Sequence, residues 1–123
     1  MLFRSRRACR VDAIALDEGK LVALRPGRLD VYDLASASRE RSVPVPSATR
    51  LDVQYGIAVL AAGRQALAVD LTNGRQAVVG RAASTLLDVA IERPGVAFAA
   101  TSARAGIAKF VPLARVQSLL GRG

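Results

Sequence analysis

Short apolar segments separated by turn residues run through the whole chain. Each segment has four to seven residues and is rich in Val, Ile, Leu or Ala. The separating pairs are Glu18-Gly19, Pro26-Gly27, Ala62-Gly63, Asn73-Gly74 and Pro94-Gly95. Apolar runs of this length, repeated at intervals of about 8–12 residues, are typical of antiparallel β-strands. The pattern therefore predicts an all-β chain.

The segments form three copies of one unit. VDAIAL from Val11 aligns with LDVQYG from Leu51 and LDVAIE from Leu87, so the copies begin 40 and 36 residues apart. Two further sets follow in the same order, namely LVALR, IAVLAAG and GVAFAAT, and then RLDVYDL, ALAVDL and the looser GIAKFVPL. A fixed period of this size indicates a repeat architecture in which each unit packs on its neighbours.

Each copy predicts an antiparallel sheet of up to four strands. The predicted strands are 11–16, 20–25, 28–34 and 39–45, then 51–55, 57–62, 66–71 and 75–80, then 87–92, 95–101 and 106–111, with no clear fourth strand in the last copy. Pro44 and Pro46 place the first copy's last strand at a sheet edge, because proline cannot donate to a strand ladder.

The Thr72-Asn73-Gly74 turn lies between two alternating runs. Asn and Gly both tolerate positive φ, so we expect a two-residue hairpin that joins an inner strand to an outer one. We interpret this turn as a chain reversal, not as a ligand loop.

Sheets of four strands that repeat every 36 to 40 residues are typical of β-propeller blades. The copies resemble blades of the bacterial propeller repeats grouped with the WD-type, quinoprotein-like and YVTN-type families. The resemblance rests on Val31-Tyr32-Asp33-Leu34 and on the string from Ala68 to Arg75, and it covers nearly all of residues 10–120. The chain has no Trp and no Gly-His or Trp-Asp pairs, so no quinone cofactor or partner-binding mode is carried over. The resemblance implies a non-enzymatic scaffold or a ligand- or protein-recognition surface.

The predicted organisation is a basic segment over 1–9 followed by one partial β-propeller over 10–123. Its blades lie near 10–49, 50–85 and 86–111, and a terminal helix covers 112–120. Closed propellers need about four to eight blades. We therefore expect a C-terminal piece of a larger propeller with missing blades, or self-association, or a protein partner. In PLARVQSLLG the residues Leu113, Val116, Leu119 and Leu120 share one helical face before Gly121, which predicts a short amphipathic helix packed as a lid on the last blade.

The net charge of +8 concentrates at the start of the chain. Arg4, Arg6, Arg7 and Arg10 lie there, and no basic stripe with interleaved aromatics follows. The alternative function is therefore a basic module in which this Arg cluster contacts nucleic acid or an acidic partner. Of these two alternatives, the propeller hypothesis accounts for more of the chain.

The candidate chemistry favours binding over catalysis. Cys9 is the single Cys and the chain has no His, so we predict no catalytic residue, no cofactor and no metal site. Asp17-Glu18 is expected to be a solvated hairpin. Tyr55 either contacts a partner at a propeller mouth or packs between blades.

Three Asp residues, Asp12, Asp52 and Asp88, align in the three copies. They are interpreted either as a ring around an axial channel or, preferably, as acceptors of backbone N–H groups, and Asp33 and Asp70 are interpreted in the second way.

No run of 18 uninterrupted apolar residues occurs, so no membrane span is predicted. The first residues lack an apolar segment of the kind found in signal peptides, which predicts a cytoplasmic protein if the chain is complete.

Overall fold

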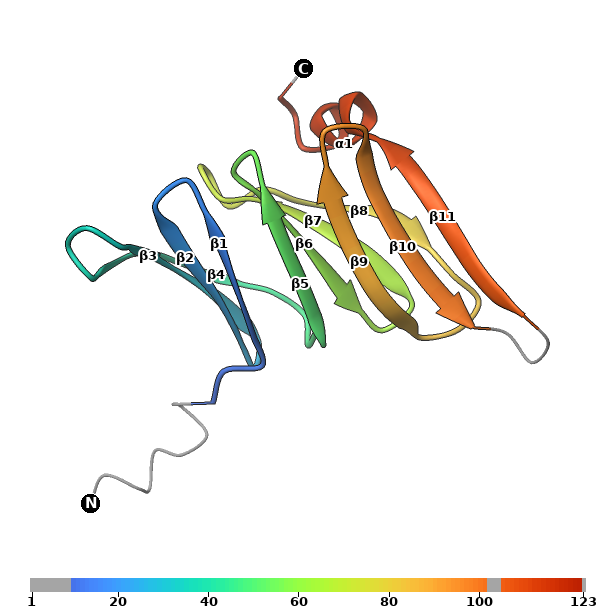
Figure 1. Cartoon of the computed structure of the whole chain (residues 1–123), viewed down its shortest axis with the longest axis horizontal. Coiled ribbons are helices and arrows are strands. Elements are labelled where there is room, and N and C mark those ends of the chain that lie inside the picture. The colour runs from blue at the N-terminus through green and yellow to red at the C-terminus, as the bar shows by residue number, and fades with distance from the viewer. Residues whose placement is uncertain (1–9, 102–104, 123) are drawn as a thin grey trace.

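The computed structural model of the 123-residue chain describes residues 10–101 and 105–122. Three antiparallel sheets stand side by side in a fan, and one short helix lies at the C-terminal end (Figure 1). We call the sheets blades 1, 2 and 3. The arrangement confirms the predicted partial β-propeller of about three blades.

The strands pair in sequence order within each blade. Blade 1 holds β1 (Ala13–Asp17), β2 (Lys20–Arg25), β3 (Arg28–Asp33) and β4 (Ser38–Pro44); blade 2 holds β5 (Arg50–Gln54), β6 (Ile57–Ala62), β7 (Gln65–Asp70) and β8 (Gln76–Arg81); blade 3 holds β9 (Leu86–Glu92), β10 (Gly95–Thr101) and β11 (Gly106–Pro112). Among the described residues blade 3 has no fourth strand, as expected, and Pro44 ends the outermost strand of blade 1. The first strand starts at Ala13, two residues later than predicted, because Asp12 lies outside the ladder with its N–H bound to the Leu24 carbonyl.

The innermost strands lie next to one another, with β5 between β1 and β9 (Figure 1). Two apolar layers separate the blades. One layer, between blades 1 and 2, includes Val22, Leu24, Leu60 and Val69. The other, between blades 2 and 3, includes Ile57. Strand β6 is buried on both sides, because alternate residues of one strand point to opposite faces of a sheet.

The turn at the start of each blade gives a common register. Asp17 pairs with Lys20 in blade 1, Gln54 pairs with Ile57 in blade 2, and Glu92 pairs with Gly95 in blade 3. Residues at the same distance from these pairs occupy equivalent positions. In blades 2 and 3, the side that faces the preceding blade is called the first face and the opposite side the last face. In blade 1, the last face is the side packed on blade 2, and the first face is the opposite side.

Two-residue hairpins occur at the inner turns, not at the turn where the sequence predicts one. Glu18 and Gly19 have φ of 45° and 78°, and Tyr55 and Gly56 have φ of 56° and 70°. Both pairs have the positive φ values of a type I′ turn. The segment from Leu71 to Arg75 does connect β7 to outer β8, but as a five-residue loop in which Gly74 has a positive φ and Asn73 does not. The hairpin prediction is wrong here because the backbone carbonyl of Asp70 accepts the Gly74 N–H and its backbone N–H donates to the Arg75 carbonyl, which closes a wider turn.

Helix α1 (Leu113–Leu119) follows β11 and packs against β8, β10 and β11. Val116 and Leu120 are 0% and 1% exposed, which confirms the predicted lid. Leu119 is 40% exposed, so its predicted place on the buried face is wrong. The chain leaves the helix at Gly121, whose φ is 79° and whose N–H donates to the Ser118 carbonyl. In the described part of the chain, no helix has the length and apolar character that crossing a membrane requires.

Candidate functional site

Carboxylates on the last face of one blade bind backbone N–H groups of the next blade. The Gly56 N–H donates to Asp17 Oδ2 at 3.0 Å, and the Ile91 N–H donates to Asp52 Oδ2 at 2.8 Å. Asp52 Oδ1 accepts the Val53 N–H at 3.0 Å, so both oxygens of this carboxylate have partners. Asp17 is therefore a link between blades, and the expectation of a solvated hairpin carboxylate is wrong.

The register separates the three aligned Asp residues. Asp52 lies two residues before the Gln54 pair, Asp88 four before the Glu92 pair, and Asp12 five before the Asp17 pair. The hypothesis of equivalent positions is therefore wrong, and the three carboxylates do not form one ring. Asp88 Oδ1 accepts the Val89 N–H, whereas Asp12 pairs with the exposed Arg10 side chain at 2.7 Å.

Asp33 and Asp70 do occupy equivalent positions and cap the following turn. Asp33 Oδ2 accepts the Ser36 N–H at 3.0 Å, and Asp70 Oδ1 accepts the Thr72 N–H at 2.9 Å. Hydrogen bonds from Ser36 hold the pKa of Asp33 below its usual value. The preferred interpretation of these two residues as turn acceptors is confirmed.

An open groove of about 390 Å³ lies between blades 1 and 2. It is lined by Asp17, Glu18, Lys20, Val31, Glu40, Arg41, Gly56, Leu71 and Thr72. Val31 and Leu71 supply an apolar floor, and the charged groups form the rim. Lys20 bonds to Glu40 at 2.8 Å, and Glu40 is the main reason that the pKa of Lys20 is raised. Arg41 donates to the Thr72 carbonyl at 2.7 Å across the two blades.

The C-terminal residues close the corresponding space between blades 2 and 3. Arg122 Nε donates to Asp70 Oδ2 at 2.8 Å, and Arg122 Nη2 donates to Asp70 Oδ1 at 3.0 Å. Arg122 Nη1 also donates to the Tyr55 carbonyl at 3.1 Å. The guanidinium lowers the pKa of the buried Asp70 carboxyl, against the opposite effect of burial. Chain residues thus occupy the second groove, and the first groove stays open.

The first face of blade 1 carries a buried carboxylate between two guanidinium groups. Asp30 is 0% exposed, with Arg25 Nε at 2.9 Å and Arg28 Nε at 3.2 Å from Oδ2. Ser42 donates to Asp30 Oδ1 at 2.6 Å, and Arg25 reaches the Tyr32 hydroxyl at 3.3 Å. The equivalent of Asp30 in blade 2 is Leu67, which is packed against blade 1.

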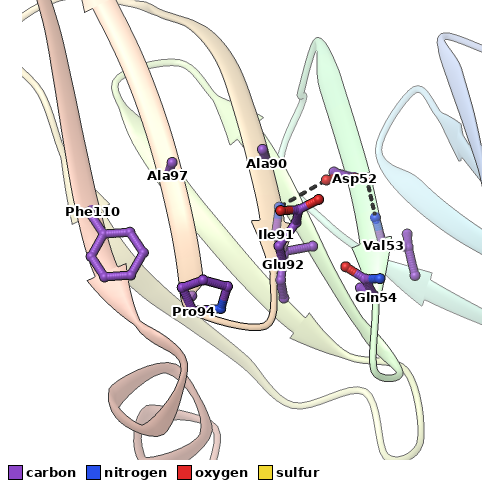
Figure 2. Close-up of a pocket in the computed structure, with 10 residues that line it drawn as sticks. Asp52, Val53, Gln54, Ala90, Ile91, Glu92, Pro94, Ala97 and Phe110 are labelled. Carbon is purple, nitrogen blue, oxygen red and sulfur yellow. Dashed lines mark hydrogen bonds between the residues drawn. The ribbon is translucent and has the colours of Figure 1, made fainter.

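A hollow of about 440 Å³ lies between strand β5 and the last face of blade 3 (Figure 2). Asp52 and Gln54 of β5 lie on one side, Glu92 and Pro94 lie in the middle, and Phe110 of β11 lies on the far side. The dashed lines in Figure 2 mark the two bonds that occupy Asp52. Because both carboxylate oxygens are occupied by N–H groups, this side chain is suited to holding the blades together rather than to taking a proton from a ligand.

The predicted partner-contact residues do not form one site. Arg4, Arg6, Arg7 and Cys9 lie outside the described residues. Arg10 lies before β1, where its carbonyl accepts Arg25 Nη1, and Tyr55 lies at the opposite end of the inner strands, in the turn that accepts Arg122. The Arg-cluster function stays a prediction.

Sequence analysis missed the groove and the two polar clusters around Asp30 and Asp70. A signal for Asp30 is present, since Leu29 and Val31 alternate with Asp30 and Tyr32 and so leave one polar face on a predicted strand. Arg122 lies 52 residues after Asp70, and no periodic signal links them.

Comparisons with known proteins support the fold. No family model matches the chain, and no curated protein matches it. Among solved structures, the β-propeller domain of Myceliophteria thermophila Cps50 (Swd1) superposes with a TM-score of 0.61 at 14% identity, over 83% of this chain and 39% of that one. Kluyveromyces lactis Hsv2 with loop 6CD replaced by a Gly-Ser linker gives 0.60 at 10% identity, over 83% and 39%. The N-terminal domain of Nup159 gives 0.55 at 14% identity, over 89% and 33%.

The Swd1 structure is a β-propeller domain, and this chain has a propeller-type fold. It spans about two fifths of the length of the Swd1 and Hsv2 chains and a third of the Nup159 chain. At these identities the likeness concerns the fold alone.

Proposed function

We propose that this chain is a non-enzymatic scaffold, a three-blade part of a β-propeller whose two end faces bind further blades. In this proposal residues 10–49, 50–85 and 86–111 are blades of one unit, residues 112–120 are its terminal helix, and residues 1–9 form a separate basic segment. The observation that carries the proposal is the exposed first face of blade 1.

Three large apolar residues of blade 1 are exposed at positions that are packed in blade 2. Ile14, Leu16 and Leu34 are 63%, 66% and 49% exposed. Their equivalents are Leu51, Val53 and Leu71, all in the apolar layer against blade 1. The third match follows from identical hydrogen bonds, because the Leu34 N–H binds the Gly19 carbonyl and the Leu71 N–H binds the Gly56 carbonyl. A blade seated here would bury the same stripe, at roughly 25 cal/mol per Å².

The last face of blade 3 has the complementary shape. Small residues form its floor, and a shallow apolar hollow of about 190 Å³ lies among Ala90, Ala97, Ala99 and Ala108. Phe110, beside it, is 55% exposed. Side chains as large as Ile14 and Leu16 on another blade would fill such a hollow.

Charge and hydrogen bonding support the same pairing. The last face carries the exposed carboxylates Asp88 and Glu92, and the first face carries Arg25 and Arg28. Glu92 occupies the position of Asp17, the residue that binds the Gly56 N–H of the next blade. It would bind the N–H at the equivalent turn of an added blade in the same way.

The added blade can come from a longer chain or from a second copy of this one. Light scattering on wild type and Leu16→Glu separates the two sources. A second copy gives a multiple of 12.9 kDa, and the variant returns the mass to that of one chain. The matched variant Leu119→Glu, at an exposed position of α1, keeps the wild-type mass.

A wild-type mass of one chain leaves the longer chain as the source. Joining one further blade before residue 10 must then raise the unfolding free energy, and the rise must vanish with Leu16→Glu. No rise would refute the scaffold proposal.

A further inference from the structure

We infer that the open groove between blades 1 and 2 binds a short, basic amphipathic helix of a protein partner, whose apolar side chains enter it as Val116 and Leu120 enter the space between blades 2 and 3. The inference names a class of partner for the scaffold proposed above. It rests on that proposal only in treating the three sheets as blades of one unit. It needs both walls of the groove, which blades 1 and 2 supply by themselves.

One wall of the open groove is equivalent to one wall of the groove that α1 fills. The opposite walls differ, because the position of Leu71 is taken in blade 3 by Leu113, the first residue of α1. In the common register Glu18 corresponds to Tyr55, Lys20 to Ile57, Val31 to Ala68, and Arg41 to Ala77. The first member of each pair lines the open groove. Ile57, Ala68 and Ala77 belong to the apolar cluster that takes in α1. The molecule therefore fills one of its two inter-blade grooves with its own helix and leaves the other empty.

The filled groove shows how a helix is held. Val116 and Leu120, four residues apart on one face of α1, are the side chains that enter the apolar layer. Beyond Gly121, Arg122 turns back and bonds to Asp70 and to the carbonyls of Tyr55 and Gly56. An apolar pair and one Arg thus hold the seven-residue helix on the blades, together with Leu113, which continues from β11 and packs on the same cluster.

The open groove keeps these elements with a more charged rim. Val31 and Leu71 provide the apolar floor, and Asp33 stands at the position of Asp70. Arg122 has no counterpart there among the described residues, and Asp33 is held by Ser36 and by Lys20 at 3.5 Å. An arginine at the end of a bound helix can share that carboxylate.

The charges that line the open groove determine which charge the bound helix should carry. The lining has three carboxylates, Asp17, Glu18 and Glu40, against the two cations Lys20 and Arg41. Asp33, beside Lys20, adds a fourth carboxylate. In a chain of net charge +8 this groove is an acidic region, and it complements a basic helix. The segment PLARVQSLLGRG has two arginines and no acidic residue, which makes it a suitable probe.

The experiment titrates the full chain into a fluorescein-labelled PLARVQSLLGRG peptide and follows anisotropy. We expect saturable binding that Glu40→Lys weakens at least about tenfold, or about 1.4 kcal/mol. Asp12→Lys makes the same charge change at the other end of β1, where Asp12 pairs with Arg10, and should leave the affinity unchanged. A peptide with Gln in place of its final Arg should bind more weakly to wild type.

Three results would overturn the inference: no binding, binding that Glu40→Lys leaves intact, or equal loss with Asp12→Lys. The second result would indicate that the peptide displaces α1 from its own groove. These results are independent of the mass measurement. If the protein is a single chain and binds the peptide, only assembly with a second copy is refuted. If it is a dimer and does not bind the peptide, only the groove inference is refuted.

Discussion

Arg122 grips Asp70 with two nitrogens, at 2.8 and 3.0 Å, and so ties the C-terminal end of the chain to the middle blade. The carboxylate is 2% exposed and the arginine side chain 27% exposed. A planar guanidinium that meets both oxygens of a carboxylate is the strongest common form of ion pair. The pair keeps α1 over the second groove, and it shows what a ligand of the first groove has to reproduce.

Arg122→Ala should lower the free energy of unfolding by about 2 kcal/mol, because a buried carboxylate loses its charged partner. Urea unfolding followed by circular dichroism measures the change. Arg115→Ala, an exposed arginine in the same helix, is the control and should change stability by less than about 0.5 kcal/mol. Equal effects of the two variants would refute a stabilising role for the Arg122–Asp70 ion pair.

Acid should weaken the wild type more than Arg122→Ala. The pKa of Asp70 in the folded chain is lowered from its ordinary value of 3.8. Between the folded and unfolded pKa values of Asp70, the unfolded chain therefore binds more protons than the folded chain. The associated stability is complete above about pH 4 and is lost as the pH falls through the folded-state pKa. Unfolding free energies at pH 6 and pH 3 should therefore differ more in wild type than in Arg122→Ala. Asp33, whose pKa is also lowered, contributes the same slope to both proteins.

Leu120→Ala and Leu119→Ala test the orientation of α1 with one residue type. Leu120 is 1% exposed and Leu119 is 40% exposed. We expect a loss of about 2–4 kcal/mol for Leu120→Ala from lost burial and the cavity that remains, and under about 1 kcal/mol for Leu119→Ala. Thermal unfolding of the two variants gives the comparison. A larger loss at Leu119 would place the other face of the helix on the blades.

Gly80→Ala should destabilise the packing of blade 2 on blade 3. A methyl group at Gly80 would collide with the ring of Phe98, which is 4% exposed in the layer between these blades. Overpacking of this kind costs about 1–3 kcal/mol. Gly106→Ala adds the same methyl to strand β11, where nothing lies within 4 Å, and serves as the control. Chemical denaturation of both variants decides whether the ring can move aside.

The repeat explains why the blades could be predicted and why their contacts could not. Alternation within each segment depends on neighbours in the chain, so the strands and the short helix follow from local pattern. Contacts between blades join residues far apart, such as Asp52 and Ile91, 39 residues later, and depend on how one sheet sits on the next.

The aligned Asp residues show the limit of the repeat. Asp12, Asp52 and Asp88 match as letters, but strand pairing counts from the turns, and the three residues lie five, two and four residues before the pairs that close their turns. The three carboxylates therefore have three different partners. The Thr72 to Gly74 turn differs for a similar reason, because Asp70 holds the following loop open at a wider span.

By itself the amino-acid order determined an all-β chain of three blades with a terminal helix, because the strand segments, their turn residues and the repeat of 36 to 40 residues are all properties of the local sequence. Tertiary structure alone decided that one groove is filled and the other open, that Arg122 meets Asp70, and that Ile14 and Leu16 remain exposed. Each of these depends on the packing of one sheet against another, a relation between distant segments that no local pattern encodes.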